Sequence, residues 1–254
     1  MKKYKLTTET LQFAGRTLHR IKAVKDFDSI KAGEFGGWIE NEKNLSQDDN
    51  AWIYGDAMVF DNAEVYDNAE VYGNANVSGN ANVFGNAKVY GNANVFGNAE
   101  VYGNANVFGN ANVFGYAEVY GNANVFGYAE VYGNAKVYGN ANVFGNAEVS
   151  DNAEVSDYAE VSDYAKVYGN AAIKGDAKVH DAVDYIVFKN FWSSGRYFTW
   201  TSSNNKWSVG CFYGTGEELI KKAYADSEKS GREYERVVRY VESILADEKK
   251  EKSN

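Results

Sequence analysis

Apolar residues recur at a fixed interval of six over half of the chain. From Ile53 to Val179 every sixth residue is Val or Ile, and the residue two positions before it is always Ala. The consensus is Val-[Tyr/Phe]-Gly-Asn-Ala-x, and 22 such units follow one another without a gap. A fixed short period is typical of a solenoid, and a period of six indicates a parallel β-helix.

One unit, Ala99–Asn104, illustrates how the pattern builds a coil. Side chains alternate between the two faces of a strand, so the Ala and Val point inward while the Glu and Tyr point outward. The Gly-Asn pair makes the corner, because both residues tolerate positive φ. Three units close a coil, so the repeats predict about seven coils and a rod roughly 34 Å long.

The hexads resemble the [LIV]-[GAED]-x-x-[STAV]-x repeat of left-handed β-helix proteins, which include the bacterial hexapeptide acyltransferases. Residues 26–40, 45–47 and 51–54 are similar to the opening of the YdcK-like hexapeptide-repeat proteins of bacteria and prophages. Members of that family are described as transferases without a shown activity. The resemblance covers about residues 4–182. It implies a mainly β fold, a triangular left-handed β-helix and a bacterial, phage or prophage source.

Three regions are expected along the chain. Residues 1–50 form an N-terminal cap and a first irregular coil, with strands at 4–8 and 16–24. Residues 51–182 form the β-helix, and residues 183–254 form a small α+β head. Trp38 is expected to cover the core of the first coil, since a solenoid end exposes strand edges and needs a cap.

The head is predicted to contain three strands and two helices. The strands are expected at 185–188, 197–201 and 207–212, with Ser- and Asn-rich turns between them. The first helix is expected at 217–226 with Thr215 as its N-cap, and the second from about 231 to 247. The residues expected on the head surface, available to a partner, are Arg196, Trp200, Trp207, Arg232 and Arg236.

The negative charge is confined to the repeats. Residues 51–182 hold five Lys or Arg and sixteen Asp or Glu, whereas the two flanking regions each have one more basic than acidic residue. A surface of this kind repels nucleic acid and anionic membranes and attracts a basic partner. The alternative interpretation is that the acidic residues keep an aromatic-rich rod in solution.

Residues eighteen apart form columns along the predicted rod. Aromatic columns include one with Tyr90, Phe108, Phe126 and Phe144 and one with Tyr102, Tyr120 and Tyr138. Stacked rings would stabilise the rod by roughly 0.5–1.5 kcal/mol per pair. The same columns would also form apolar stripes for contact with a partner or with a second copy, as a dimer or trimer. An acidic column contains Glu64, Glu100, Glu118 and Glu154, and it could imitate a nucleic-acid backbone.

Catalytic chemistry has one candidate residue. Hexapeptide acyltransferases use a histidine base near a cleft between subunits and carry loops that interrupt the coils. No insertion occurs between Ile53 and Val179, and of the two histidines only His180 lies at the end of the repeats, in the aromatic slot. The structural alternative is a polar residue that ends a stack. The sequence has no metal-ligand cluster and no phosphate-binding glycine loop, so no metal or cofactor is expected.

Cysteine usage and hydropathy suggest a compartment. Cys211 has no second cysteine to pair with, the N-terminus lacks a signal-peptide core, and the chain has no long apolar run. A reducing cytoplasm and no membrane contact are expected. The favoured function is a non-enzymatic interaction or scaffold protein that presents the head to a protein partner on a rigid rod. The alternatives are an inhibitor of a nucleic-acid-binding host or defence enzyme, by acidic mimicry or steric block, and an acyltransferase-like enzyme.

Overall fold

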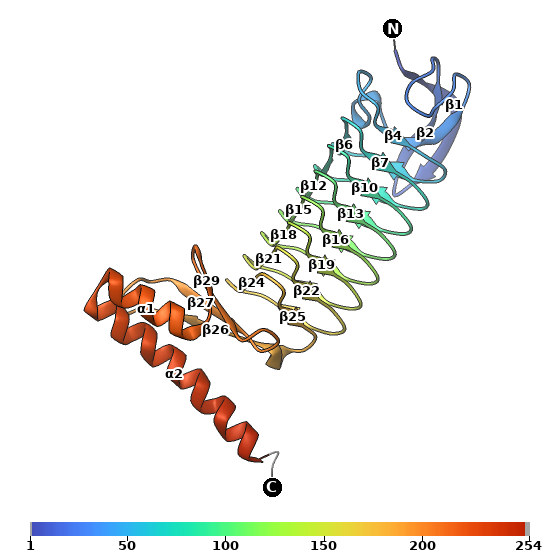
Figure 1. Cartoon of the computed structure of the whole chain (residues 1–254). Coiled ribbons are helices and arrows are strands. Elements are labelled where there is room, and N and C mark those ends of the chain that lie inside the picture. The colour runs from blue at the N-terminus through green and yellow to red at the C-terminus, as the bar shows by residue number, and fades with distance from the viewer. Residues whose placement is uncertain (1, 252–254) are drawn as a thin grey trace.

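The computed structural model describes residues 2–251, which form a β-solenoid with a hairpin at its N-terminal end and a sheet and two helices at its C-terminal end (Figure 1). Three sheets, here called walls, enclose the solenoid core, and their strands are parallel except in the pairs that β2 makes with β1 and β3. Wall 1 begins with the antiparallel hairpin and consists of β1 (Tyr4–Phe13), β2 (Arg16–Ala23), β3 (Phe35–Ile39), β5 (Met58–Val59), β8 (Asn76–Val77), β11 (Asn94–Val95), β14 (Asn112–Val113), β17 (Glu130–Val131), β20 (Glu148–Val149) and β23 (Lys166–Val167).

The other two walls contain only two-residue strands. Wall 2 consists of β4 (Trp52–Ile53), β7 (Glu70–Val71), β10 (Lys88–Val89), β13 (Asn106–Val107), β16 (Asn124–Val125), β19 (Asn142–Val143), β22 (Glu160–Val161) and β25 (Lys178–Val179). Wall 3 consists of β6 (Glu64–Val65), β9 (Asn82–Val83), β12 (Glu100–Val101), β15 (Glu118–Val119), β18 (Lys136–Val137), β21 (Glu154–Val155) and β24 (Ala172–Ile173). Each strand pairs in parallel with the strand eighteen residues away, as the period predicts.

The solenoid has about eight turns rather than about seven. Ile39 pairs with Val59 in wall 1, and Leu45 forms a bridge to Val65 in wall 3, so the irregular first coil begins before the first regular unit. Val stacks on Val and Ala on Ala through the interior, and these side chains are fully buried. Each coil contacts only its neighbours, so the stability of the rod is close to a sum of nearest-neighbour terms.

Outside the ladders of the two-residue strands, most backbone hydrogen bonds between coils are donated by one coil to the coil that follows it in sequence. The N–H of Tyr102 donates to the carbonyl of Val119 at 3.0 Å, and the same step of seventeen residues recurs through the walls. The first coil therefore has carbonyls with no coil before it to donate to them, and the last coil has N–H groups with no coil after it to accept from them. For these groups, a cap at the first coil must supply donors and a cap at the last coil must supply acceptors.

Glycine at the corners is favoured by both conformation and space. Gly103 has φ +72°, and a Cβ there would lie 3.0 Å from the backbone nitrogen of Gly121 in the next coil. Aspartate replaces glycine at five corners near the rod ends, also at positive φ, namely Asp61, Asp67, Asp151, Asp157 and Asp163. The Asp157 carboxylate accepts the N–H of Gly175 at 3.0 Å, so a bond to the next coil offsets the cost of the left-handed backbone.

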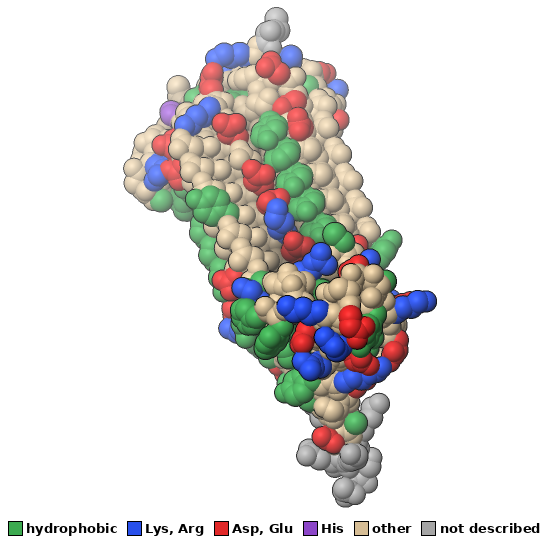
Figure 2. All heavy atoms as spheres, turned by 90° about the vertical axis from the view of Figure 1, so that its left-hand side faces the viewer, with side chains coloured by type: hydrophobic (Ala, Val, Ile, Leu, Met, Phe, Trp, Pro, Cys, Tyr) green, Lys and Arg blue, Asp and Glu red, His purple; other side chains and the backbone are tan. Residues whose placement is uncertain are grey.

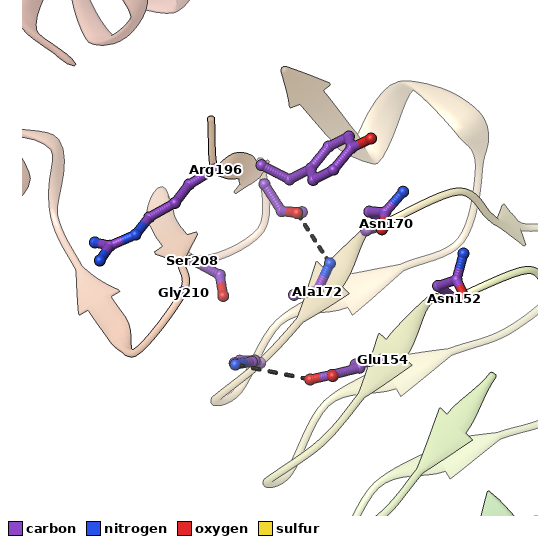
Figure 3. Close-up of a pocket in the computed structure, with 11 residues that line it drawn as sticks. Asn152, Glu154, Asn170, Ala172, Arg196, Ser208 and Gly210 are labelled. Carbon is purple, nitrogen blue, oxygen red and sulfur yellow. Dashed lines mark hydrogen bonds and ion pairs between the residues drawn. The ribbon is translucent and has the colours of Figure 1, made fainter. Parts of the chain in front are cut away.

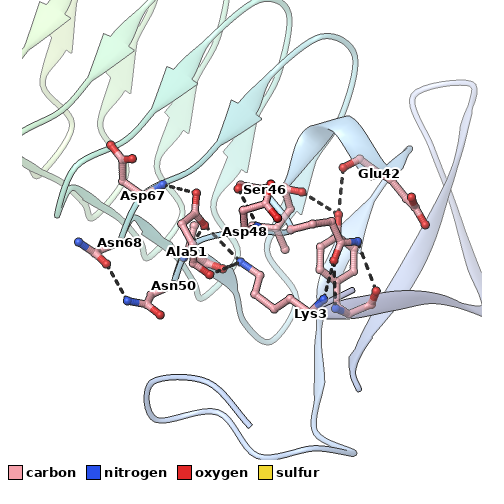
Figure 4. Close-up of polar contacts among 12 residues, drawn as sticks. Lys3, Glu42, Ser46, Asp48, Asn50, Ala51, Asp67 and Asn68 are labelled. Atoms are coloured by element: carbon pink, nitrogen blue, oxygen red, sulfur yellow. Dashed lines mark hydrogen bonds and ion pairs between the residues drawn. The ribbon is translucent and has the colours of Figure 1, made fainter. Parts of the chain in front are cut away.

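The N-terminal cap supplies donors to the exposed carbonyls. Lys3 is buried, and its Nζ donates to the carbonyl of Asp49 at 3.0 Å and to that of Ala51 at 2.8 Å (Figure 4). The Tyr4 hydroxyl donates to the carbonyl of Leu45 at 2.8 Å. Burial lowers the pKa of Lys3, although the Asp49 carboxylate opposes this effect.

Trp38 does not cover the core, so that prediction is wrong. Its neighbour Ile39 points inward, and strand alternation therefore places Trp38 on the outside of wall 1. There it packs with Leu18 of the hairpin and with Phe60. A short 3-10 turn, Glu42–Asn44, follows β3 and leads into wall 3.

The C-terminal head is a four-stranded antiparallel sheet covered on one face by two helices. After the 3-10 turn Ala182–Asp184, its elements are β26 (Tyr185–Lys189), β27 (Tyr197–Thr201), β28 (Lys206–Val209), β29 (Phe212–Gly214), α1 (Gly216–Asp226) and α2 (Glu228–Glu251). The expected third strand is two strands, because Gly210 at φ +58° begins a turn in its middle. Thr215 is the N-cap of α1, as predicted, in a capping box with Glu218. The α2 helix begins earlier than predicted, because the Ser227 hydroxyl accepts the N–H of Ser230.

The sheet of the head caps the rod. Phe198 and Trp200 face the helices, while Thr199 between them faces the last coil. The Thr199 hydroxyl accepts the N–H of Ala172 at 2.9 Å, and the Ser203 hydroxyl accepts that of Lys178 at 2.8 Å. Hydroxyl oxygens of the head thus accept hydrogen bonds from N–H groups of the last coil. At the N-terminal end, by contrast, Lys3 and Tyr4 donate to carbonyls.

Candidate functional site

His180 lies on the last coil, where the rod meets the head. Its Nδ1 is 2.7 Å from Ser162 Oγ and 3.3 Å from Asp163 Oδ2. A Ser-His-Asp triad needs the serine and the carboxylate at different ring nitrogens, with an accessible serine oxygen. Here both partners approach Nδ1, and Ser162 is buried. The arrangement therefore supports an ordered polar end to an aromatic column rather than a nucleophile activated by a base.

The aromatic columns are stacked rings. Tyr90, Phe108, Phe126 and Phe144 have centroids 4.8–5.0 Å apart and ring planes within 5° of parallel. Tyr102, Tyr120 and Tyr138 repeat this geometry at 4.9–5.0 Å. All seven rings are half-buried at the corners. This geometry accounts for a structural role, and the predicted homo-oligomer stays a prediction.

Alkaline pH is expected to destabilise the rod through the stacked tyrosines. Burial, with the Glu118 carboxylate second, raises the pKa of Tyr102, and burial also raises the pKa of Tyr120 and Tyr138. Below an unfolded-state pKa of about 10, these hydroxyls are protonated in both states and contribute nothing to pH dependence. As pH rises above about 10, the unfolded chain ionises first, so stability falls. Denaturant unfolding at a series of pH values measures this effect.

The matched variant is a triple Tyr-to-Phe change at these three positions. It keeps the ring stack and removes the titrating groups, so its stability should fall less steeply above the unfolded-state pKa of tyrosine. An unchanged slope would contradict this origin of the pH dependence.

The acidic column exists in wall 3 but is partly neutralised. Glu64, Glu100, Glu118 and Glu154 point outward from strands of this wall, interrupted by Asn82 and Lys136. Lys136 Nζ lies 2.8 Å from Glu118, and Lys174 Nζ lies 4.0 Å from Glu154. The column is therefore not a continuous row of free negative charge, and the geometry does not favour nucleic-acid mimicry.

The residues predicted on the head surface divide into two groups. Arg196, Arg232 and Arg236 are exposed. Trp200 and Trp207 are only 3% and 2% exposed, so their prediction as surface residues is wrong. Both rings pack against the helices. The indole N–H of Trp200 donates to Asn205 Oδ1 at 2.9 Å, so this polar group is buried with a hydrogen-bond partner.

A neighbouring loop, missed at the level of sequence, exposes two aromatic side chains. Phe191 and Trp192 are 72% and 62% exposed between β26 and β27. The Asn190 side chain holds the loop, because its Oδ1 accepts the N–H groups of Trp192 and Ser193 at 3.0 and 3.1 Å. Asn190 is itself buried. In the sequence, the Phe-Trp dipeptide followed by Ser-Ser-Gly is the pattern that could have indicated exposed rings in a turn. We call residues 190–195 the aromatic loop.

A cavity of about 260 Å³, here called the junction cavity, lies between the last coils and the head (Figure 3). Its polar lining comes from Asn152, Glu154, Asn170 and Lys174 of the rod and from Arg196, Tyr197 and Ser208 of the head. The rod residues and head residues are far apart in sequence, so no local pattern pointed to this cavity. An adjoining hollow of about 540 Å³ is lined by Tyr168, Tyr185 and Tyr197 among others.

Figure 2 shows one face of the molecule, on which charged side chains of both signs are mixed. Figure 2 shows hydrophobic side chains in a line along the rod, and Lys and Arg mixed with Asp and Glu over the head. Within residues 2–251, no group of three or more His, Cys, Asp or Glu is placed to hold a metal ion. None of the helices in this part of the chain is long and apolar enough to cross a bilayer.

These features define a β-solenoid protein with uninterrupted coils and a cap at each end, a fold consistent with the hexapeptide-repeat β-helix. No protein-family model matches the chain. The chain has a distant, partial similarity to a protein of Escherichia coli (strain K12) named uncharacterized acetyltransferase YdcK, at 39% identity over 62 residues. The matched stretch is 21% of this chain and 19% of the length of that protein.

Proposed function

We propose that this protein is a non-enzymatic interaction protein, in which a rigid rod presents the aromatic loop of the head to a protein partner. The observation that carries the proposal is the pair of exposed rings, Phe191 and Trp192, held by the buried Asn190. Large aromatic side chains in a fixed position lose little entropy on binding, and they commonly dominate the binding energy of protein interfaces.

The rod supports the same proposal by what it lacks between β4 and β25. No loop leaves the coils in that range, so no inserted segment there covers a wall to build a substrate site. We further infer a left-handed, triangular winding from the resemblance of the hexads to left-handed β-helix proteins. The single Cys211, which has no second cysteine to pair with, fits a reducing compartment such as the cytoplasm.

The test is affinity purification from the native host followed by mass spectrometry, with three forms of the full chain. The wild type and a Tyr116→Ser variant, which removes an exposed ring from the rod, are expected to retain the same specific partner. The Phe191→Ser/Trp192→Ser double variant is expected to lose it. Equal recovery of all partners with the double variant would refute the proposal.

Acetyl transfer is a second candidate, favoured by the name of the partial relative. His180 would then be the base at the rod–head junction. Titration calorimetry with acetyl-CoA should give heat of binding, and acetyl transfer to an amine should be lost in His180→Ala. Absence of binding by the wild-type chain would remove this candidate.

A further inference from the structure

The junction cavity contains a buried hydroxyl that lacks a partner. Ser208 is 5% exposed, and its Oγ has no hydrogen bond within the described part of the chain. In Figure 3 this hydroxyl lies on the side of β28 that faces the coils. A buried hydroxyl without a partner disfavours folding, so such a group in the wall of a cavity points to a molecule that binds there.

Two amide side chains add further free hydrogen-bonding groups. Asn152 Oδ1 accepts from Asn134, which leaves the amide N–H groups of Asn152 available. Asn170 occupies the end of the same column, and its side chain makes no hydrogen bond with the described residues. Amide groups of this kind donate to and accept from hydroxyls with defined direction.

The charged groups that line the cavity are one carboxylate paired with a lysine and, among the described residues, one unpaired arginine. Glu154 is compensated by Lys174 at 4.0 Å and also accepts from the Tyr138 hydroxyl at 3.2 Å. Arg196 lies at the rim beside Gly210, where its exposed side chain extends away from the other lining residues in Figure 3, with no ion pair among the described residues. An unpaired guanidinium at the rim of a cavity favours a carboxylate, which it can bind through two parallel hydrogen bonds.

We propose that the junction cavity binds a single sugar residue that carries a carboxylate, such as a uronic acid. The volume of about 260 Å³ lies just below the range of roughly 300–1,000 Å³ typical of drug-sized sites, so the occupant is about one ring in size. The Tyr197 ring offers an apolar face, and Asn152, Asn170 and Ser208 offer partners for hydroxyls. The exposed Arg196 side chain turns inward from the rim to receive the carboxylate. This proposal goes beyond the interaction function and does not depend on it.

The test is titration of the full-length protein with glucuronate by calorimetry, supported by saturation-transfer NMR. Arg196→Gln is expected to weaken binding by about tenfold or more, because a charge-assisted pair is lost. Arg232→Gln, which changes an exposed arginine elsewhere on the head, is expected to leave binding unchanged. Glucose, which has the same ring without the carboxylate, is expected to bind at least about tenfold more weakly than glucuronate.

Ser208→Ala separates a ligand-binding role from a structural one. Without ligand, the variant should melt at the same temperature as the wild type or higher, because an unpartnered buried hydroxyl is removed. Its affinity for glucuronate should nevertheless fall about threefold. The proposal is overturned if glucuronate does not bind, if glucose binds equally well, or if acetate or inorganic phosphate binds as tightly as glucuronate. An equal loss of binding in Arg232→Gln would also overturn it.

Discussion

A chain that ends at residue 182 is expected to associate end to end. Removal of the head exposes Ile173 and Val179, which are fully buried in the whole chain, and frees the N–H groups of Ala172 and Lys178. An uncapped edge of this kind is a template for pairing with another chain. Sedimentation velocity at several micromolar concentrations should give a larger, more concentration-dependent species than the full chain gives.

A matched control separates loss of the cover from loss of hydrogen bonds. Thr199→Val combined with Ser203→Ala removes two acceptors of the head but leaves the sheet over the last coil. This variant should lose about 1–3 kcal/mol of stability, mainly through the part-buried N–H of Ala172, because the exposed N–H of Lys178 can bind water instead. It should not show the association seen after truncation. If the truncated chain sediments as the full chain does, the head is not required as a cap.

Lys3→Met is expected to destabilise the opposite end of the rod. The change leaves the carbonyls of Asp49 and Ala51 without their buried donor and removes an ammonium that lies 5.1 Å from the centre of the Phe27 ring. The loss should be about 2–4 kcal/mol, since breaking a buried network costs the desolvation of the groups left behind. Denaturant unfolding measures the total, and hydrogen exchange should locate faster opening in the first coils.

Lys2→Met is the control for this prediction. Lys2 pairs with Glu42 at an exposed site, and exposed ion pairs contribute about 0–1 kcal/mol. The control should therefore stay close to the wild type. Equal losses in the two variants would show that general charge, rather than the buried position of Lys3, governs the stability of this end.

Much of the rod could be predicted because the residue pattern that determines its fold is short, local and repeated. The Ala-x-Val spacing determines which side chains are buried, and the period of six places each unit on the unit three repeats later. The aromatic columns, the acidic column and the glycine corners follow from this register. The count of turns was short by one, because Ile39 and Leu45 enter the solenoid through an irregular coil that lacks the repeat.

The errors concern side chains whose environment comes from distant parts of the chain. Trp200 and Trp207 alternate with polar residues as surface strand residues do, yet the face they occupy meets α1 and α2. Trp38 is covered by a hairpin whose packing the pattern of its own strand does not reveal. In each case a nonlocal partner decided which face of a strand is buried.

The sequence by itself determined the solenoid, its register and its inward column of Val and Ala, because every six-residue unit forms the same short strand and corner. Only the tertiary structure decided how the two ends are satisfied, with Lys3 donating at the first coil and Thr199 accepting at the last. It also decided where the junction cavity lies. The physical reason is that the caps and the cavity arise only where segments far apart in the sequence meet, so no repeated local pattern specifies them.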